Sequence, residues 1–142
     1  KTIDLSRHIG TGSGLGIGVA SPEDDLLAMT TDDGSEGLVY FPAQDKVLST
    51  GPMRTVGSTN EPMIMPYIDA YSKHVIFADV TGNVALFDLV NGNGKPERFT
   101  VKFSPRFIRT GWLESTWILA GDKGIMFQSF KDPSDRKVLC IS

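Results

Sequence analysis

Residues 74–89 read HVIFADVTGNVALFDL, and this stretch decides the fold class. Residues 74–78 and 84–89 are mostly apolar, whereas residues 79–83 between them carry Asp, Thr, Gly and Asn. Apolar runs of this length, rich in β-branched and aromatic residues, are typical of strands, and the polar residues between them are typical of a tight turn. The stretch therefore predicts a β-hairpin.

The hairpin pattern occurs three times along the chain. Residues 26–41 and 116–127 each give an apolar run, a polar turn that carries Asp and Gly, and a second apolar run with an aromatic end. The aromatic ends Phe41, Phe87 and Phe127 follow one another after 46 and 40 residues, and about 40 residues is the length of a four-stranded propeller blade. The predicted units are a Gly-rich leading strand or linker (1–18) and one domain (19–142) of three blade-like repeats, at about 19–62, 63–100 and 101–142.

Signals for helices are nearly absent. The 142 residues include 15 Gly and 8 Pro, and no window of about a dozen residues keeps an apolar helical stripe free of them. The sequence predicts an all-β protein built from β-propeller-like blades of antiparallel strands. A β-trefoil is the alternative, because it also has three repeats of about 40 residues, and a β-sandwich is a third. Trefoil lectins carry a Gln-x-Trp motif in each repeat, whereas here only Gln128-Ser129-Phe130 is similar.

Three short motifs resemble the repeats of the WD40 family of β-propellers. Phe103-Ser104-Pro105 looks like the element that opens many such repeats, and residues 19–28 (VASPEDDLLA) resemble the same opening with its acidic turn. Residues 86–89 (LFDL) are similar to the Leu-Trp-Asp-Leu strand end of the family. The chain has no Trp-Asp pair and no Gly-His pair before a repeat, so the hydrogen-bonded tetrad of the family is not carried over. The resemblance implies a propeller that binds other proteins.

Three blades do not complete a propeller, which closes with about four to eight blades. We expect the missing blades to come from the rest of a longer protein, from another chain or from a second copy of this chain. The sequence begins at Lys1 without an initiator Met. We therefore expect a piece of a longer protein or a processed chain.

Charge and composition argue against two classes of partner. A net charge of -3 with scattered basic residues disfavours nucleic acid, and no apolar run approaches the roughly 20 residues that span a bilayer. The single Cys140 forms no internal disulfide, which favours a reducing compartment, cytoplasmic or nuclear. We predict that neither nucleic acid nor a membrane is a partner.

No motif for a cofactor, a metal or catalysis is evident. The Gly-rich run at residues 10–18 matches neither phosphate-binding loop pattern, and no helix follows it, so we interpret it as a linker or a close-packed strand. The acidic residues of the first repeat do not have the spacing of a calcium-binding loop. His8, His74 and Cys140 do not form a zinc motif. We predict no catalytic residue, no cofactor and no metal.

Four residues are candidates for partner binding. Trp112 falls in a predicted turn, where an exposed indole would anchor a partner. Met53, Met63 and Met65 lie in a long connection with three prolines, and their flexible side chains suit an adaptable contact surface, with packing beneath a loop as the alternative. We predict a non-enzymatic protein–protein interaction or scaffold module that supplies blades of a WD40-like propeller to a larger protein or complex. A carbohydrate-binding β-trefoil lectin-like domain is the alternative.

Overall fold

The described part of the chain consists of strands and their connections. The computed structural model describes residues 2, 5, 14–21, 23, 25–53, 63, 66–69, 73–110, 116–132 and 134–141, without the side chains of Ile17 and Thr110. The strands are β1 (Leu15–Ser21), β2 (Leu26–Thr31), β3 (Glu36–Phe41), β4 (Lys46–Pro52), β5 (Tyr67–Asp69), β6 (His74–Ala78), β7 (Asn83–Asp88), β8 (Glu97–Thr100), β9 (Ser104–Thr110), β10 (Thr116–Asp122), β11 (Gly124–Ser129) and β12 (Arg136–Cys140). Within these described ranges, no helix is long and apolar enough to cross a membrane.

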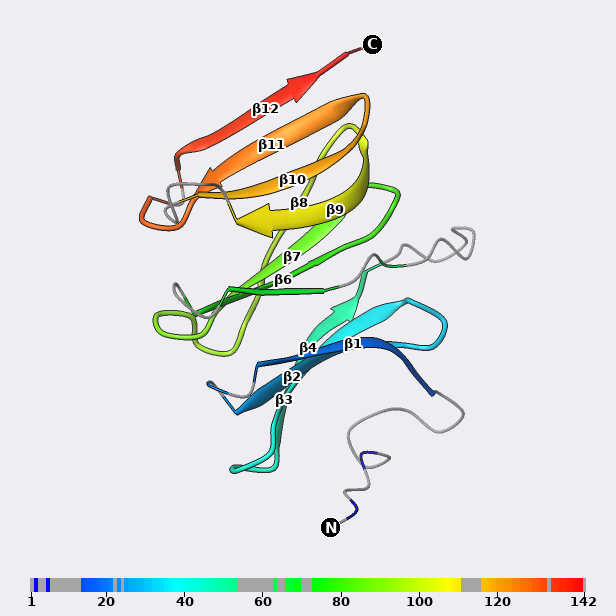
Figure 1. Ribbon diagram of the computed structural model, residues 1–142, viewed down its shortest axis with the longest axis vertical. Coiled ribbons are helices and arrows are strands. Elements are labelled where there is room, and N and C mark those ends of the chain that lie inside the picture. Colours follow the sequence, from blue (N-terminus) through cyan, green and yellow to red (C-terminus); the bar gives the residue numbers. More distant parts are fainter. Residues whose placement is uncertain are drawn as a thin grey trace.

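The strands form three separate four-stranded sheets. Sheet 1 has the order β1-β2-β3-β4, sheet 2 the order β5-β6-β7-β8 and sheet 3 the order β9-β10-β11-β12, and every neighbouring pair is antiparallel. Figure 1 shows the sheets stacked face to face from the N-terminus to the C-terminus. The prediction of an all-β, propeller-like fold is confirmed. The β-trefoil alternative is wrong, because consecutive hairpins stay within their own sheets.

The first strands of the three sheets lie next to one another. Strand β1 contacts β5, and β5 contacts β9, whereas β4, β8 and β12 form the opposite edges of their sheets. Sheets that converge along their first strands and diverge toward their last strands have the radial arrangement of propeller blades. The chain therefore presents three consecutive blades, with β1, β5 and β9 innermost.

Sheet 2 is packed on both faces, and strand β6 shows this most clearly. All five of its residues are buried. Val75 and Phe77 pack toward sheet 1, whereas Ile76 and Ala78 pack toward sheet 3. Successive side chains of a strand point to opposite faces. A continuous apolar run is therefore what a strand between two neighbouring sheets requires.

The first interface, between sheets 1 and 2, is an apolar core. The rings of Phe77 and Phe87 meet edge to face, with centroids 6.1 Å apart. The ring of Phe77 also lies against Gly37, where an added Cβ would fall 2.5 Å from a ring carbon. The buried members are Leu26, Ala28, Val39, Met53, Met63, Val75, Phe77, Ala85 and Phe87.

The second interface, between sheets 2 and 3, is apolar at its centre. Trp117, Leu119 and Met126 of sheet 3 are fully buried there against Ile76 and Ala78 of sheet 2. Burying an aliphatic or aromatic side chain of this size stabilises a fold by roughly 1.5–3 kcal/mol relative to leaving it exposed. This interface differs from the first at one end, where polar side chains replace apolar ones.

The turn between β6 and β7 is organised by Asp79. This carboxylate is fully buried and accepts hydrogen bonds from the backbone N–H and hydroxyl of Thr81, at 3.0 and 2.7 Å, and from the backbone and side-chain amides of Asn83, at 3.0 and 2.8 Å. Gly82 adopts a φ of +104° in this turn, which favours glycine. The turn expected from the sequence is thus held by its own Asp, Thr, Gly and Asn.

The Gly-rich segment enters sheet 1 as a strand. Strand β1 begins at Leu15, inside the predicted leading segment, and its pairing with β2 is irregular between Leu15 and Gly18. A Cβ on Gly16 would lie 2.8 Å from the Thr30 hydroxyl and 2.9 Å from the Thr31 carbonyl. The close packing expected of this run is therefore present at Gly16. The irregular pairing means that the glycines do not all lie on one face of the strand. The remainder of the run, residues 10–13, lies outside the described residues.

The motifs that resemble the WD40 family occupy different places in the blades. Ser104-Pro105 begins the innermost strand β9, whereas Ser21 ends the innermost strand β1 and Pro22 follows it. The two Ser-Pro pairs are therefore not equivalent positions of one repeat. The fold supports a propeller, and it does not support the narrower assignment to WD40 repeats.

The outer face of sheet 3 is apolar and partly exposed. Phe107 is 46% exposed and Leu139 is 61% exposed. Ile125 lies opposite Leu139 in the sheet, and Ile118 lies opposite Phe127. These five side chains alternate with those that pack in the second interface. The described residues leave this face without a neighbouring sheet.

Candidate functional site

A polar hollow opens at one end of the second interface. Its volume is about 220 Å³. It lies beside the β7–β8 and β11–β12 connections, which Figure 1 shows on the same side of the sheets. The lining residues are His74, Leu86, Asp88, Asn91, Gly92, Lys95, Glu97, Trp117, Gln128, Ser129 and Phe130.

His74 and Asp88 reach the hollow because of the alternation in β6 and β7. They lie opposite each other in the hairpin, on the face of sheet 2 that also carries Ile76 and Leu86. His74 is 8% exposed, and its Nε2 lies 3.7 Å from Asp88 Oδ2. Its Nδ1 is buried and has no hydrogen-bond partner among the described residues. The Phe130 ring covers the imidazole, with centroids 5.1 Å apart.

The Asp88 carboxylate is stabilised in its ionised form. Burial raises the pKa of Asp88, but hydrogen bonds from the backbone N–H groups of Asn91 and Val90, the side-chain amide of Asn91 and the charge of His74 outweigh burial and leave the pKa below its ordinary value. The backbone bonds measure 2.9 Å from Asn91 and 3.0 Å from Val90. Asp88 therefore presents a negative charge to the imidazole near neutral pH.

Trp117 and Gln128 form the sheet 3 side of the hollow, directly opposite each other on β10 and β11. The indole Nε1 of Trp117 is buried without a hydrogen-bond partner among the described residues. Gln128, which is 1% exposed, donates to the Ser129 carbonyl at 3.1 Å and accepts from Arg136 Nε at 2.5 Å. An unpaired buried polar atom is unfavourable. Both nitrogen atoms belong to side chains that line the hollow.

Arg136 joins the two sheets at the wall of the hollow. Its guanidinium donates to Glu97 Oε1 at 2.6 Å and lies 3.6 Å from the ring centroid of Phe99. Glu97 and Phe99 belong to β8 of sheet 2, whereas Arg136 begins β12 of sheet 3. Because Arg136 also holds Gln128, it fixes one wall of the hollow relative to the other.

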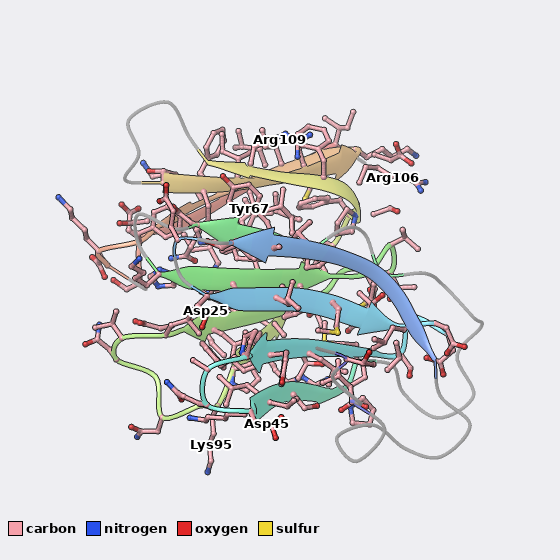
Figure 2. All side chains as sticks on the ribbon, turned by 60° about the horizontal axis from the view of Figure 1, so that its bottom comes forward. Asp25, Asp45, Tyr67, Lys95, Arg106 and Arg109 are labelled. Carbon is pink, nitrogen blue, oxygen red and sulfur yellow. The ribbon has the colours of Figure 1, made fainter. Side chains whose placement is uncertain are left out.

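Lys95 lies at the mouth of the hollow. It lines the space, and Figure 2 shows its side chain extending outward from the β7–β8 connection. None of the ion pairs between described residues uses its ammonium group. A positive charge is therefore available where a ligand would enter.

Two other hollows are less suited to chemistry. One, of about 210 Å³, lies beside the innermost strands and includes Tyr67, Ile108 and Arg109 in its lining. Ile108 packs in the second interface, so Arg109 points from the other face of β9, and Figure 2 shows it on the side of β9 away from Tyr67. The other hollow, of about 360 Å³, lies along the edge of sheet 3, where Lys123 supplies the only charged side chain of the lining. No group of three or more His, Cys, Asp or Glu in the described ranges could hold a metal.

The structure places two of the four predicted binding residues in the core. Met53 and Met63 are 2% and 4% exposed and pack in the first interface, which agrees with the packing alternative rather than with an exposed contact surface. Met65 and Trp112 lie outside the described residues. A partner-binding role for these two stays a prediction.

Sequence reasoning missed His74, Asp88, Trp117 and Gln128 as a group. His74 lies opposite Asp88 in one hairpin, and Trp117 lies opposite Gln128 in another. Locating the two turns in the sequence would therefore have paired these residues. His74 and Asp88 stand at equal distances from Thr81 in the sequence, for example. The stacking of sheet 3 on sheet 2, which brings both pairs to one place, carries no local sequence signal.

Comparisons with known proteins support the fold. No protein-family model matches the chain, and no curated protein matches it in sequence. A similar solved structure is that of the periplasmic gluconolactonase PpgL of Pseudomonas aeruginosa, with a TM-score of 0.59 and 12% sequence identity. The match covers 94% of this chain and 44% of that chain, so this chain spans less than half the length of that protein. At an identity this low, the structural similarity shows a shared fold and nothing more.

The comparison corrects the predicted function. A solved structure that shares this fold is that of an enzyme, and this finding contradicts the prediction of a non-enzymatic scaffold module. Its alternative, a β-trefoil lectin-like domain, is wrong because the three sheets are separate blades.

Proposed function

We propose that the protein is a propeller enzyme that hydrolyses a small lactone or a similar ester, with His74 as the general base. The observation that carries the proposal is the pairing of His74 with Asp88 at the hollow, where Nδ1 has no hydrogen-bond partner in the part of the chain that the structure describes. The fold shared with a gluconolactonase supports the same reaction class. The proposal also covers the substrate of the whole protein and the presence of propeller blades beyond these three.

The imidazole is suited to take up a proton. Asp88 faces Nε2, which favours the tautomer that carries its proton there and leaves the lone pair on Nδ1. In the proposed reaction, water attacks the carbonyl carbon and its proton passes to Nδ1. The bond from the carbonyl carbon to the ring oxygen then breaks, and His74 returns the proton to that oxygen. Asp88 stabilises the imidazolium that forms between the two steps.

Trp117 supplies the second role that ester hydrolysis needs. Negative charge develops on the carbonyl oxygen during attack, and preorganised donors in a site shielded from water stabilise it. The indole N–H of Trp117, which has no partner among the described residues, is such a donor. His74 Nδ1 and the indole nitrogen are both buried, so in the proposed reaction substrate and water reach them only when the side chains that cover them move.

The test is hydrolysis of D-glucono-δ-lactone by the full chain, followed as acid release above the uncatalysed rate. We expect His74→Gln to lower the rate by about 10²–10⁴-fold, the usual contribution of a general base. The control is Lys46→Gln, an exposed residue of sheet 1. A wild-type rate equal to the background, or full activity in His74→Gln, would contradict the proposal.

Further propeller blades form the second part of the proposal. The exposed Phe107 and Leu139 lie on a face equivalent to those buried between sheets 1, 2 and 3, which supports another four-stranded blade as the occupant. The rest of a longer protein, another chain or a second copy could supply it. Sedimentation of the isolated chain is expected to show self-association, and a monodisperse 15.4 kDa monomer would contradict this part. The cytoplasmic or nuclear location stays a prediction.

A further inference from the structure

The carboxylates of the hollow already have their partners. Asp88 accepts hydrogen bonds from the backbone of Val90 and Asn91 and from the Asn91 amide, and it faces His74. Glu97 accepts from Arg136 at 2.6 Å. Asp88 therefore has little remaining demand for donors from a ligand, and the Glu97 oxygen that faces Arg136 has its partner.

Three side chains of the hollow carry donor groups that a ligand could use. The Trp117 indole N–H has no partner among the described residues. The Ser129 hydroxyl oxygen accepts from the backbone N–H groups of Lys131 and Asp132, at 3.1 and 3.2 Å, which leaves its own proton to donate. Lys95 adds an ammonium group at the mouth that joins none of the ion pairs between described residues. Among the described residues, His74 Nδ1 is a buried acceptor without a partner, in the tautomer that Asp88 favours.

We infer that the hollow binds small hydroxycarboxylates, and that Lys95 selects the ionised acid over neutral molecules of the same shape. Carboxylate oxygens would accept from Trp117, Ser129 and Lys95, and a neighbouring hydroxyl would donate to His74 Nδ1. The volume of about 220 Å³ corresponds to roughly seven water molecules at about 30 Å³ each. A compact hydroxy acid therefore fits the space.

The inference rests on the proposed function for the origin of this ligand, because hydrolysis of a lactone yields a hydroxycarboxylate. The product would then stay bound and slow the reaction. Lys95 thereby becomes a specificity-determining residue, separate from the proton transfer assigned to His74.

Binding is tested by NMR on the full chain labelled with ¹⁵N. The two indole N–H signals belong to Trp112 and Trp117, and Trp112→Phe assigns them. The probes are D-gluconate and lactate, with D-glucitol and lactamide as their uncharged counterparts. We expect a saturable shift of the Trp117 signal with at least one carboxylate and weaker binding, by about tenfold, in Lys95→Gln, since a hydrogen bond to a charged group is lost. Lys46→Gln, a lysine of sheet 1 far along the chain, should bind as wild type does.

The inference is overturned if neither carboxylate gives a saturable shift, if an uncharged counterpart binds as tightly, or if Lys95→Gln binds as well as Lys46→Gln. This readout needs no turnover. Binding without hydrolysis would therefore remove the proposed function and keep the hydroxycarboxylate site. Hydrolysis of the lactone without binding of either carboxylate would contradict the proposed selectivity of the site but not the proposed enzymatic function.

Discussion

The two interfaces of sheet 2 use the same strands in different ways. On the side of sheet 1, Val75 and Phe77 of β6 pack against apolar side chains. On the side of sheet 3, the same strand presents Ala78, Ile76 and then His74, so that the apolar column ends in a polar residue. One propeller blade can therefore seal one interface and carry a site in the other, because alternation gives each face its own residues.

The largest expected effect concerns the sealed interface. Phe77→Ala should destabilise the fold by about 3–5 kcal/mol, because it leaves a cavity where a fully buried ring packs against Phe87 and Gly37. Urea denaturation measures the loss. The matched control is Phe107→Ala on the outer face of sheet 3, where the ring is 46% exposed. Equal losses in the two variants would show that Phe77 is packed no more tightly than a half-exposed ring.

A smaller loss is expected in the wall of the hollow. Gln128→Ala removes a buried amide that holds Arg136 and the Ser129 carbonyl, which should reduce stability by about 1–3 kcal/mol because both partners lose a bond. Gln44→Ala, at an exposed glutamine between β3 and β4, serves as control and should be close to neutral. If Gln128→Ala left the stability unchanged, the contacts of Gln128 with Arg136 and Ser129 would contribute nothing to the stability of the fold.

Trp117→Phe should cost less than a comparable change in the first interface. The substitution loses part of a buried ring but also removes an unpaired N–H, and the two effects partly offset each other, leaving a loss of about 1 kcal/mol. Thermal and urea denaturation provide the comparison. A loss as large as that of Phe77→Ala would indicate that the indole N–H is satisfied in the folded protein.

The smallest expected effect is on the response to acid. The pKa of Asp88 is lowered in the folded state, so ionised Asp88 contributes stability above its ordinary pKa of 3.8, and this contribution is lost as the pH falls through the folded-state value. We expect Asp88→Asn to lose less stability than wild type between about pH 6 and about pH 2. Asp122→Asn, in an exposed pair with Arg106, controls for loss of a surface carboxylate. An unchanged acid response in Asp88→Asn would contradict the assignment.

The sequence allowed prediction of the fold because local signals and the repeat agreed. The runs around Asp79, with Gly82 and Asn83 in the turn, indicated a hairpin that the structure contains. The structure does not support the narrower assignment to WD40 repeats, because Ser21 ends β1 whereas Ser104 begins β9, although Pro follows both in the sequence. Three-letter motifs do not encode their position in a sheet.

The candidate site was only partly accessible to sequence reasoning. Hairpin symmetry could have paired His74 with Asp88 and Trp117 with Gln128. Nothing in the sequence places Arg136 against Glu97, since the two lie 39 residues apart and meet only because two sheets stack. Long-range contacts of this kind depend on how blades pack, which short-range patterns do not specify.

The burial of β6 on both faces has a kinetic consequence. Sheets 1 and 3 each gain one neighbour from the described residues, whereas sheet 2 gains two, and in a linear array of repeats stability is shared between nearest neighbours. The backbone amides of Ile76 and Phe77 should therefore exchange with solvent deuterium only when the whole array opens, and those of β12 should exchange first. The middle blade would then be the last part of the chain to lose its structure.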